Sequence, residues 1–265
     1  MQILWLNEPL YKRKAMELKN TTIIKRKLLG TWYFLIVWIC AGPVYAGPLN
    51  DTGMTSCANA TTNNLSCPQV GFLGQDAEYG RDVTHSNPLD GHAGFSYTKI
   101  DSNGNDLLAS AVNWDCVRDN VTGLMWEVKT NDGGLRDKNW TYTWFDSDET
   151  TNAGIVGTEN GGNCGNSTDC DTEKFVVRVN QGAPLMCGYN DWRLPLPHEL
   201  LTLNALGRVN PSADSDYFPN MQSTFYWGGV SYAGLRSYAW WVYFYTGHVG
   251  NYPKSRMLLV RLVRK

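Results

Sequence analysis

The stretch Trp240-Trp-Val-Tyr-Phe-Tyr245, close to the end of the chain, predicts a strand whose two faces differ. Successive side chains of a strand point to opposite sides, so these six residues form two rows. The rows are Trp240, Val242 and Phe244 on one face, and Trp241, Tyr243 and Tyr245 on the other. One row can fill a core, and we expect the second row to meet solvent or a ligand.

Three other short strings of residues, far apart in the sequence, contain Trp, Arg or Glu next to apolar residues. They are Thr122-Gly-Leu-Met-Trp-Glu127, Asp191-Trp-Arg-Leu-Pro195 followed by Glu199-Leu200, and Val260-Arg-Leu-Val-Arg264. We assign structural roles to residues of these strings and of the neighbouring strands. The residues are Trp126, Glu127, Trp192, Arg193, Glu199, Trp227, Trp240 and Arg261.

Two expectations for these residues can be tested by geometry. Trp192 should fill the core, while Arg193 should pair with a carboxylate such as Glu199 or Glu127. Arg261 and Arg264 alternate with apolar residues on a closing strand, which favours solvation or a structural ion pair over ligand binding.

The composition excludes some classes of protein. The chain has 265 residues, 43% of them hydrophobic, so it can bury a core and is not disordered overall. Its net charge of −2 provides no basic surplus for a phosphate backbone, so we expect no nucleic-acid partner. The 11 Trp, 14 Tyr and 26 Gly residues, with only 18% charged residues, favour a loop-rich extracellular fold.

The N-terminal segment predicts export. Lys25-Arg-Lys27 precedes an apolar run from Leu28 to Ala41, and Val44-Tyr-Ala46 has small residues at cleavage spacing. We therefore interpret residues 1–46 as a signal peptide, with Met16 as an alternative start. An uncleaved membrane anchor is the alternative, and membrane contact is expected through this segment only. The exported chain would be periplasmic, secreted or held at the cell surface.

The cysteines that follow this segment are even in number and predict disulfides. We expect Cys57 to pair with Cys67, and Cys164 with Cys170, because each pair closes a short polar loop. Cys116 and Cys187 would then join the body of the domain. A zinc site is disfavoured because the cysteines form no Cys-x-x-Cys pair and have no His at ligand spacing.

The remaining sequence predicts an irregular lead-in over residues 47–93 and one main domain over residues 94–265. Residues 129–172 should form long surface loops, because Gly, Asn, Asp and Thr dominate there. The spacing of apolar residues predicts a helix over 172–180 and a second helix from Pro197 to just before Gly207. We expect strands over 95–100, 225–227, 240–245 and 258–263, and a hairpin from 114 to 128.

The chain resembles the domain family of unknown function that includes the C-terminal domain of the Legionella collagen-like protein. The resemblance extends over residues 57–265 and rests on the strings above, on Cys116-Val-Arg-Asp-Asn-Val-Thr122 and on Cys187-Gly-Tyr-Asn-Asp191. It implies an α+β, C-type lectin-like fold that is loop-rich, with short helices packed on small antiparallel sheets. It also implies export, adhesion to glycans or surfaces in some members, and no established catalytic residue.

Some members of this family resemble the variable proteins of diversity-generating retroelements. That resemblance implies a set of presented side chains near the C-terminus, held by a fixed scaffold. The presented set would be Leu235, Arg236, Ser237, Trp241, Tyr243, Tyr245, His248, Asn251, Tyr252, Ser255, Arg256 and Met257.

We expect the ligand to lie on Trp241, Tyr243 and Tyr245, because aromatic rings suit both sugar faces and protein hot spots. The rim of this site would contain Arg236, His248, Tyr252 and Arg256. In the alternative interpretation, the row packs beneath a loop or against a neighbouring subunit of a homo-oligomer.

No metal or cofactor is expected. Asp101-Ser-Asn-Gly-Asn-Asp106 resembles a calcium loop but lacks Gly at its sixth position and Glu at its twelfth, so a β-turn is favoured. The sequence contains no Gly-x-Ser-x-Gly elbow and no helical pair of histidines.

The first hypothesis for function is therefore an exported, lectin-like binding domain that recognises a glycan or a surface protein without chemistry. The alternatives are an enzyme similar to the formylglycine-generating enzymes, which would need a free thiol among Cys164, Cys170 and Cys187, and a structural subunit of a surface assembly.

Overall fold

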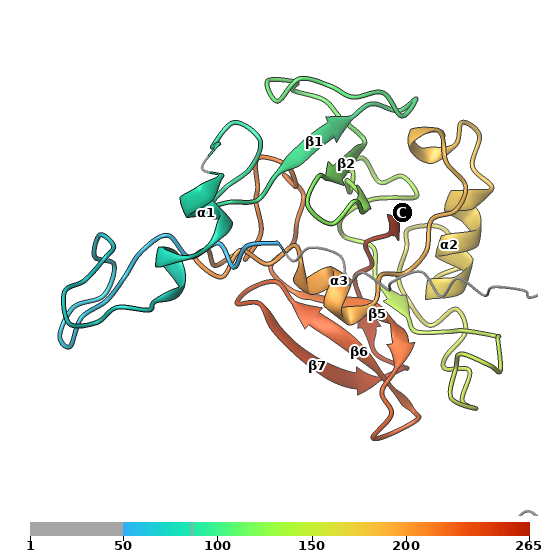
Figure 1. The fold of residues 1–265 in the computed structure, drawn as a ribbon. Helices are drawn as coiled ribbons and strands as arrows, with labels where there is room; N and C mark the ends of the chain where they lie inside the picture. The colour runs from blue at the N-terminus through green and yellow to red at the C-terminus, as the bar shows by residue number, and fades with distance from the viewer. Residues whose placement is uncertain (1–49, 86) are drawn as a thin grey trace, which may run out of the picture. The chain divides into compact units, whose positions relative to one another are not determined.

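The computed structural model describes residues 50–85 and 87–265, so the predicted signal peptide lies outside the described residues. The described chain combines short helices with small antiparallel sheets, as the sequence predicted (Figure 1). No described helix has the length and apolar character needed to cross a membrane.

The first sheet contains four strands in the order β1-β2-β3-β9. Strand β1 (Tyr97–Ile100) pairs with β2 (Cys116–Asp119), which forms the predicted hairpin with β3 (Met125–Glu127). The turn of this hairpin is stabilised by the Asp119 carboxylate, which accepts hydrogen bonds from the Val121 and Thr122 amides at 2.9 and 3.1 Å. Gly123 then takes a positive φ of 73°, a conformation that favours glycine.

The predicted closing strand over 258–263 is wrong as a single element. Strand β8 (Met257–Leu258) pairs with β4 (Tyr142–Thr143), whereas β9 (Val263–Arg264) pairs with β3. The chain passes from one sheet to the other between them, and residues 258–263 are buried throughout. The apolar sequence of residues 258–263 correctly predicted that they are buried. It did not reveal that the chain passes from one sheet to another within this segment.

The third sheet has the order β5-β6-β7. Strand β5 (Phe225–Ser231) pairs with β6 (Tyr238–Tyr243), and β6 pairs with β7 (His248–Pro253). Strand β7 was not predicted, because Gly250, Asn251 and Pro253 have low strand propensity. Strand β6 ends at Tyr243, two residues before the predicted end, where a four-residue turn begins.

The helices are short. Helix α2 (Thr172–Asn180) matches its prediction and begins where the Asp171 side chain accepts a hydrogen bond from the Lys174 amide at 2.8 Å. Helix α3 (Pro197–Leu201) is shorter than predicted, and Leu206 at its expected end is exposed. The remaining helical elements are single turns, namely η1 (Asp76–Glu78), α1 (Arg81–Thr84) and η2 (Met186–Gly188).

Two clusters of buried side chains form the core. One contains Trp126, Leu200, Tyr226, Val242 and Phe244, and it lies between the first sheet and one face of the third sheet. The other surrounds the Cys116–Cys187 disulfide and includes Tyr142, Trp144, Trp192 and Trp227. The prediction that residues 129–172 are only surface loops is therefore partly wrong, since this stretch contributes buried rings to the second cluster.

The lead-in is irregular, as predicted, but it packs on the domain. The Asn50 side chain donates hydrogen bonds to the Asp119 carboxylate at 2.6 Å and to the Thr202 carbonyl at 3.0 Å. The Leu206 amide also donates to the Thr52 carbonyl. The lead-in thus helps to hold the segment that follows α3.

Candidate functional site

The predicted ligand row lies on one face of the β5-β6-β7 sheet. In the pairing register, Trp241 is opposite Trp227 and Gly250, while Tyr243 is opposite Phe225 and His248. Tyr252 points to the same face because it lies two residues beyond Gly250. We call this surface the ring face and define it by Phe225, Trp241, Tyr243, Tyr245 and Tyr252.

The rings of this face contact one another in a continuous series. The Phe225 ring stacks on Tyr243 with centroids 4.3 Å apart and meets Trp241 edge to face at 4.8 Å. Trp241 contacts Tyr252 at 5.1 Å, and Tyr243 stacks on Tyr245 at 5.9 Å. Offset and edge-to-face pairs of this kind stabilise a fixed arrangement of rings.

The ring face is partly exposed. Tyr245 keeps 43% of its surface exposed, while Phe225, Trp241, Tyr243 and Tyr252 are half-buried. Phe225, Trp241 and Tyr252 also pack against the second core cluster. The inner end of the row therefore belongs in part to the core, and the outer end meets solvent.

A cavity of about 400 Å³ opens at the inner end of the ring face. It lies beneath the turn that joins β7 to β8, where the Arg256 guanidinium stands 5.6 Å from the Tyr252 ring. The cavity is lined by Phe225, Tyr252, Ser255, Arg256, Met257 and Leu258. It combines flat apolar walls with a cation and a hydroxyl, a mixture suited to orienting a small polar ligand.

The structure brings together six of the seven predicted ligand residues. Trp241, Tyr243, Tyr245 and Tyr252 belong to the ring face, His248 points to that face, and Arg256 lines the cavity. Arg236 is the exception. It lies in the exposed turn between β5 and β6, beside Gly154, and is not among the residues that line the cavity.

The Trp241 indole lies over Gly250 of the neighbouring strand. A Cβ atom at Gly250 would approach the Trp241 ring to 2.4 Å, so only glycine leaves room for the indole. The glycine on β7 thus allows the indole to lie flat across the neighbouring strand.

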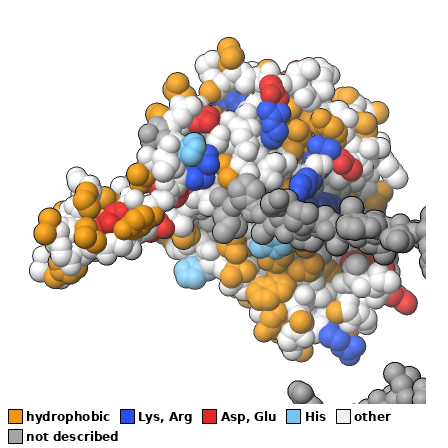
Figure 2. All heavy atoms as spheres, in the orientation of Figure 1, with side chains coloured by type: hydrophobic (Ala, Val, Ile, Leu, Met, Phe, Trp, Pro, Cys, Tyr) orange, Lys and Arg blue, Asp and Glu red, His pale blue; other side chains and the backbone are white. Residues whose placement is uncertain are grey.

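The charges near the ring face are positive. The sequence has no Asp or Glu after Asp216, whereas Arg236, Lys254 and Arg256 lie in the segments around this sheet. Hydrophobic side chains gather over the region of β6 and β7 on the side of the molecule that Figure 2 shows. Of these three cations, Arg256 stands beside the ring face, 5.6 Å from the Tyr252 ring, whereas Lys254 is buried.

Lys254 fixes the loop next to this surface. Its ammonium group donates to the Asn152 and Ile155 carbonyls at 2.9 and 2.5 Å and lies 4.1 Å from the Trp144 ring centroid. Burial lowers the pKa of Lys254 to about 8, and the nearby Asp146 opposes this shift. The hydrogen bonds of this buried ammonium group are made to the protein itself, so it is not available to a ligand.

The presented set differs from the scaffold in burial. None of its twelve residues is buried. Of the positions that the same resemblance assigns to the scaffold, Ala239, Val242, Phe244, Lys254 and residues 260–263 are buried, whereas Tyr232, Ala233, Tyr238, Trp240, Gly247 and Arg264 are not. Leu235, Ser255 and Met257 are exposed, and Ser237 and Asn251 are half-buried. Substitutions at these positions would leave the core clusters in place.

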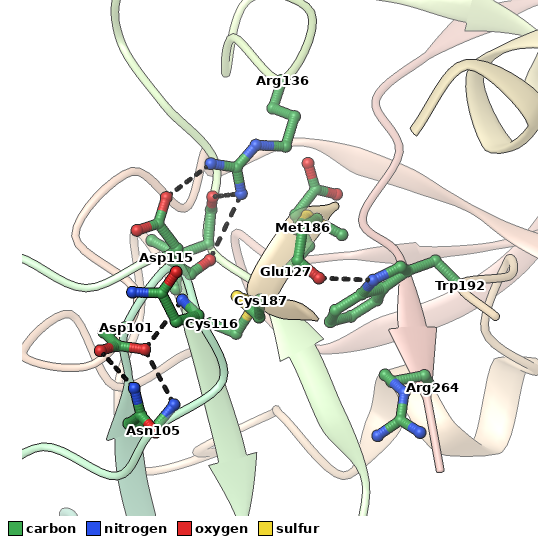
Figure 3. Close-up of a disulfide and its surroundings, with 12 residues drawn as sticks. Asp101, Asn105, Asp115, Cys116, Glu127, Arg136, Met186, Cys187, Trp192 and Arg264 are labelled. Carbon is green, nitrogen blue, oxygen red and sulfur yellow. Dashed lines mark hydrogen bonds and ion pairs between the residues drawn. A yellow bond between two sulfur atoms is a disulfide. The ribbon is translucent and has the colours of Figure 1, made fainter. Parts of the chain in front are cut away.

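Of the structural motif, Glu127 and Trp192 lie near the Cys116–Cys187 disulfide (Figure 3), whereas the other motif tryptophans are spread over both core clusters and the third sheet. Trp192 is buried, and its indole N–H donates to the Met186 carbonyl at 3.1 Å. Arg193 forms a bidentate pair with Glu199 at 2.7 Å, so Glu199, and not Glu127, is its partner. Trp126 and Trp227 are buried, whereas Trp240 is half-buried and packs on Tyr232.

The expectation that Arg261 is solvated or ion-paired is wrong. Arg261 is fully buried, donates to the Glu127 carbonyl, and lies 5.0 Å from the Phe218 ring centroid. The Glu127 carboxylate instead forms an ion pair with the buried Lys129 at 3.1 Å. It also accepts a hydrogen bond from the Leu262 amide at 3.0 Å. Arg264 does form the predicted type of ion pair, with Asp191 at 2.6 Å.

All six described cysteines form disulfides. The pairs are Cys57–Cys67, Cys116–Cys187 and Cys164–Cys170, which are the predicted pairs. Such bonds indicate an oxidising, extracytoplasmic environment. Among the described residues, no thiol is left for the chemistry that the enzyme hypothesis requires.

The described residues contain other cavities and no candidate metal cluster. The Asp101 carboxylate closes a turn by accepting from the Asn103 and Asn105 amides. An apolar cavity of about 590 Å³ lies between α2, β5 and the 193–196 segment, but the polar groups of Asp146, Thr151 and Glu173 at its rim are bonded within the protein. Compared with this cavity, the ring face offers a ligand more aromatic rings together with the polar groups of Ser255 and Arg256.

Sequence reasoning missed the role of Phe225 in the site. Its strand was predicted, but the register that places it opposite Tyr243 and in contact with Trp241 depends on pairing between distant residues.

The model of one protein family, the Lcl C-terminal domain, matches residues 115–264. The chain belongs to this family. The match contains the hairpin of β2 and β3, the structural motif and the whole ring face, so the Lcl C-terminal domain includes every element of the candidate site. The match begins after the lead-in, although the resemblance was expected from residue 57. No curated protein matches the chain.

Proposed function

We propose that this protein is an exported, lectin-like binding domain that holds a glycan on the ring face. The observation that carries the proposal is the series of partly exposed rings from Tyr252 through Trp241, Phe225 and Tyr243 to Tyr245, which ends at a cavity of about 400 Å³. Sugar rings present flat C–H faces that pack on aromatic side chains, and their hydroxyls need polar partners nearby.

The arrangement supports binding without chemistry. Tyr252 and Phe225 would hold a sugar ring in the cavity, while Arg256 and Ser255 would bond its oxygen atoms. Tyr243 and Tyr245 would extend the contact to neighbouring sugars. Arg256 has no acidic partner within ion-pair distance among the described residues, so the site suits neutral or acidic glycans.

A glycan array tests the proposal directly. We would compare the wild-type protein with a variant that carries Tyr243→Ala and Arg256→Ser, two changes at partly exposed positions. The matched control is Tyr79→Ala, because Tyr79 is a tyrosine with 72% of its surface exposed and lies in the lead-in. Each protein would first be shown to keep its three disulfides and its thermal midpoint.

The expected result is that the double variant loses at least about tenfold in affinity, equivalent to about 1.4 kcal/mol, whereas the control binds as wild type does. Equal binding by all three folded proteins would overturn the assignment of the site. Binding to intact cells but to no glycan would instead favour a surface protein as the ligand.

A further inference from the structure

We propose that two copies of this chain associate edge to edge, by antiparallel pairing of their β7 strands. Strand β7 forms one edge of the β5-β6-β7 sheet. The opposite edge of the sheet is covered, because the Trp227 amide donates to the Leu259 carbonyl and the Leu259 amide donates to the Phe225 carbonyl. The inference concerns backbone groups and does not depend on the proposed glycan site.

The direction of the β7 backbone groups follows from one hydrogen bond. The Lys254 amide donates to the Ser237 carbonyl at 2.9 Å, across the β6-β7 pair. The pairing has no register shift, and backbone groups alternate in direction along a strand. His248, Gly250 and Tyr252 therefore bond to β6, whereas Val249, Asn251 and Pro253 direct their backbone groups away from the sheet.

These outward groups are unpaired among the described residues. The Val249 and Asn251 amides and carbonyls take part in no other hydrogen bond within the described chain. Pro253 has no N–H, and its carbonyl accepts from the Arg256 amide at 2.9 Å. The edge thus offers donors and acceptors at Val249 and Asn251 only.

This pattern matches a second copy of itself in one register. If a two-fold axis passes through Gly250, Val249 of each copy lies opposite Asn251 of the other, and each pair exchanges two hydrogen bonds. All outward donors are then satisfied. An axis through Asn251 would instead place Val249 opposite Pro253, which has no N–H to donate.

The side chains are compatible with this pairing. On the ring face, His248 of one copy would lie opposite Tyr252 of the other; on the reverse face, Val249, which is 45% exposed, would lie opposite Asn251. No charged Lys, Arg, Asp or Glu occurs from His248 to Pro253, although such residues commonly protect edge strands. The pairing would join two ring faces into one surface.

Sedimentation velocity over a range of concentrations tests the proposal. The variant V249K/N251K would place lysines opposite lysines, and V249E/N251E would place glutamates opposite glutamates. We expect wild type to dimerise, each double variant to associate at least about tenfold more weakly, and an equimolar mixture of the two variants to recover the dimer. Leu108→Lys, at an exposed position on another part of the surface, is the control.

Three results would overturn the proposal. Wild type could remain monomeric at every concentration, its dimer could be insensitive to both double variants, or the mixture could fail to associate. If the variants do not fold, amide hydrogen exchange of the wild-type protein decides the matter. The Val249 and Asn251 amides must then become protected as concentration rises, while the Gly250 amide stays protected throughout.

Discussion

The two rows of the segment 240–245, which begins in β6 and ends in the turn after it, are built from similar side chains but have different surroundings. Val242 and Phe244 are fully buried, and the Phe244 ring meets Tyr226 at 5.2 Å. On the opposite face, Trp241 and Tyr243 are half-buried and Tyr245 is exposed. Aromatic content therefore does not distinguish core from surface in this sheet. The distinction comes from the packing: α3 and the segment after it contribute to the cluster that contains Val242 and Phe244, whereas the second cluster contacts Trp241 but leaves Tyr245 exposed.

The largest effect should come from breaking the buried face. Phe244→Ala removes a fully buried ring, and we expect it to reduce the free energy of unfolding by about 3–5 kcal/mol. Tyr245→Ala, at the adjacent exposed position, should change it by no more than about 0.5 kcal/mol. Denaturant unfolding with disulfides intact measures both values. Similar losses for the two variants would contradict the difference between the faces.

A smaller effect is expected from the lysine beside the ring face. Lys254→Met leaves the carbonyls of the buried Asn152 and the half-buried Ile155 without their donor and should cost about 1–3 kcal/mol. Lys265→Met, at an exposed terminal lysine, is the control.

The effect of Lys254→Met should also depend on pH. The pKa of Lys254 is about 8 in the folded chain, because of burial, and near 10.5 in the unfolded chain. Between these values the unfolded chain binds more protons, so raising the pH stabilises the wild-type fold through this group. The difference in unfolding free energy between wild type and Lys254→Met should therefore grow from pH 8 to pH 10.5. A constant difference would show that the lysine is not desolvated.

The packing of Trp241 can be changed from the neighbouring strand. Gly250→Ala introduces a methyl group where the indole lies, and we expect a cost of about 1–3 kcal/mol together with a change in tryptophan fluorescence. Val249→Ala, on the reverse face, should leave the fluorescence unchanged. If Gly250→Ala has no effect on either quantity, the indole does not lie across Gly250 in solution.

The smallest effect is expected far from both faces. Asp191→Asn removes the pair between the exposed Asp191 and the half-buried Arg264 and should cost no more than about 1 kcal/mol. The hydrogen bond from Arg264 lowers the pKa of Asp191, so the pair contributes above the unfolded pKa near 3.8 and its contribution disappears as pH falls through the lower folded value. Wild type and variant should become equally stable in acid, and binding to the ring face should not change.

Local sequence signals predicted much of the fold. The Asp119 turn, the hairpin around it and α2 depend on neighbouring residues, and each lies where the sequence placed it. Strand β7 was missed because its Gly, Asn and Pro are poor strand formers, and pairing with β6 outweighs that preference. The segment 258–263 was assigned to one strand because hydrophobicity reports burial and not the identity of the neighbouring strand.

The candidate site was predicted in part for the same reason. Alternation along β6 placed Trp241 and Tyr243 on one face, and this required no knowledge of distant contacts. Phe225 joins them through the β5-β6 register, while Arg236 is separated from them by a turn whose geometry the sequence did not reveal. The fully buried Arg261 could not be expected from composition, because arginine is rarely buried without a partner.

The crosslink between Cys116 and Cys187 has a mechanical consequence. These residues are 71 positions apart, and an extended chain spans about 3.3–3.6 Å per residue, so the bond withholds a long segment from extension under load. The last strand, β9, is hydrogen-bonded to β3 in the sheet that also contains β1 and β2. Tension between the lead-in and the C-terminus would act on this sheet, on the contacts of the lead-in with Thr202 and Leu206, and on the bridge between Val263 and Arg193. The segment closed by the disulfide would not lengthen even if these contacts were lost.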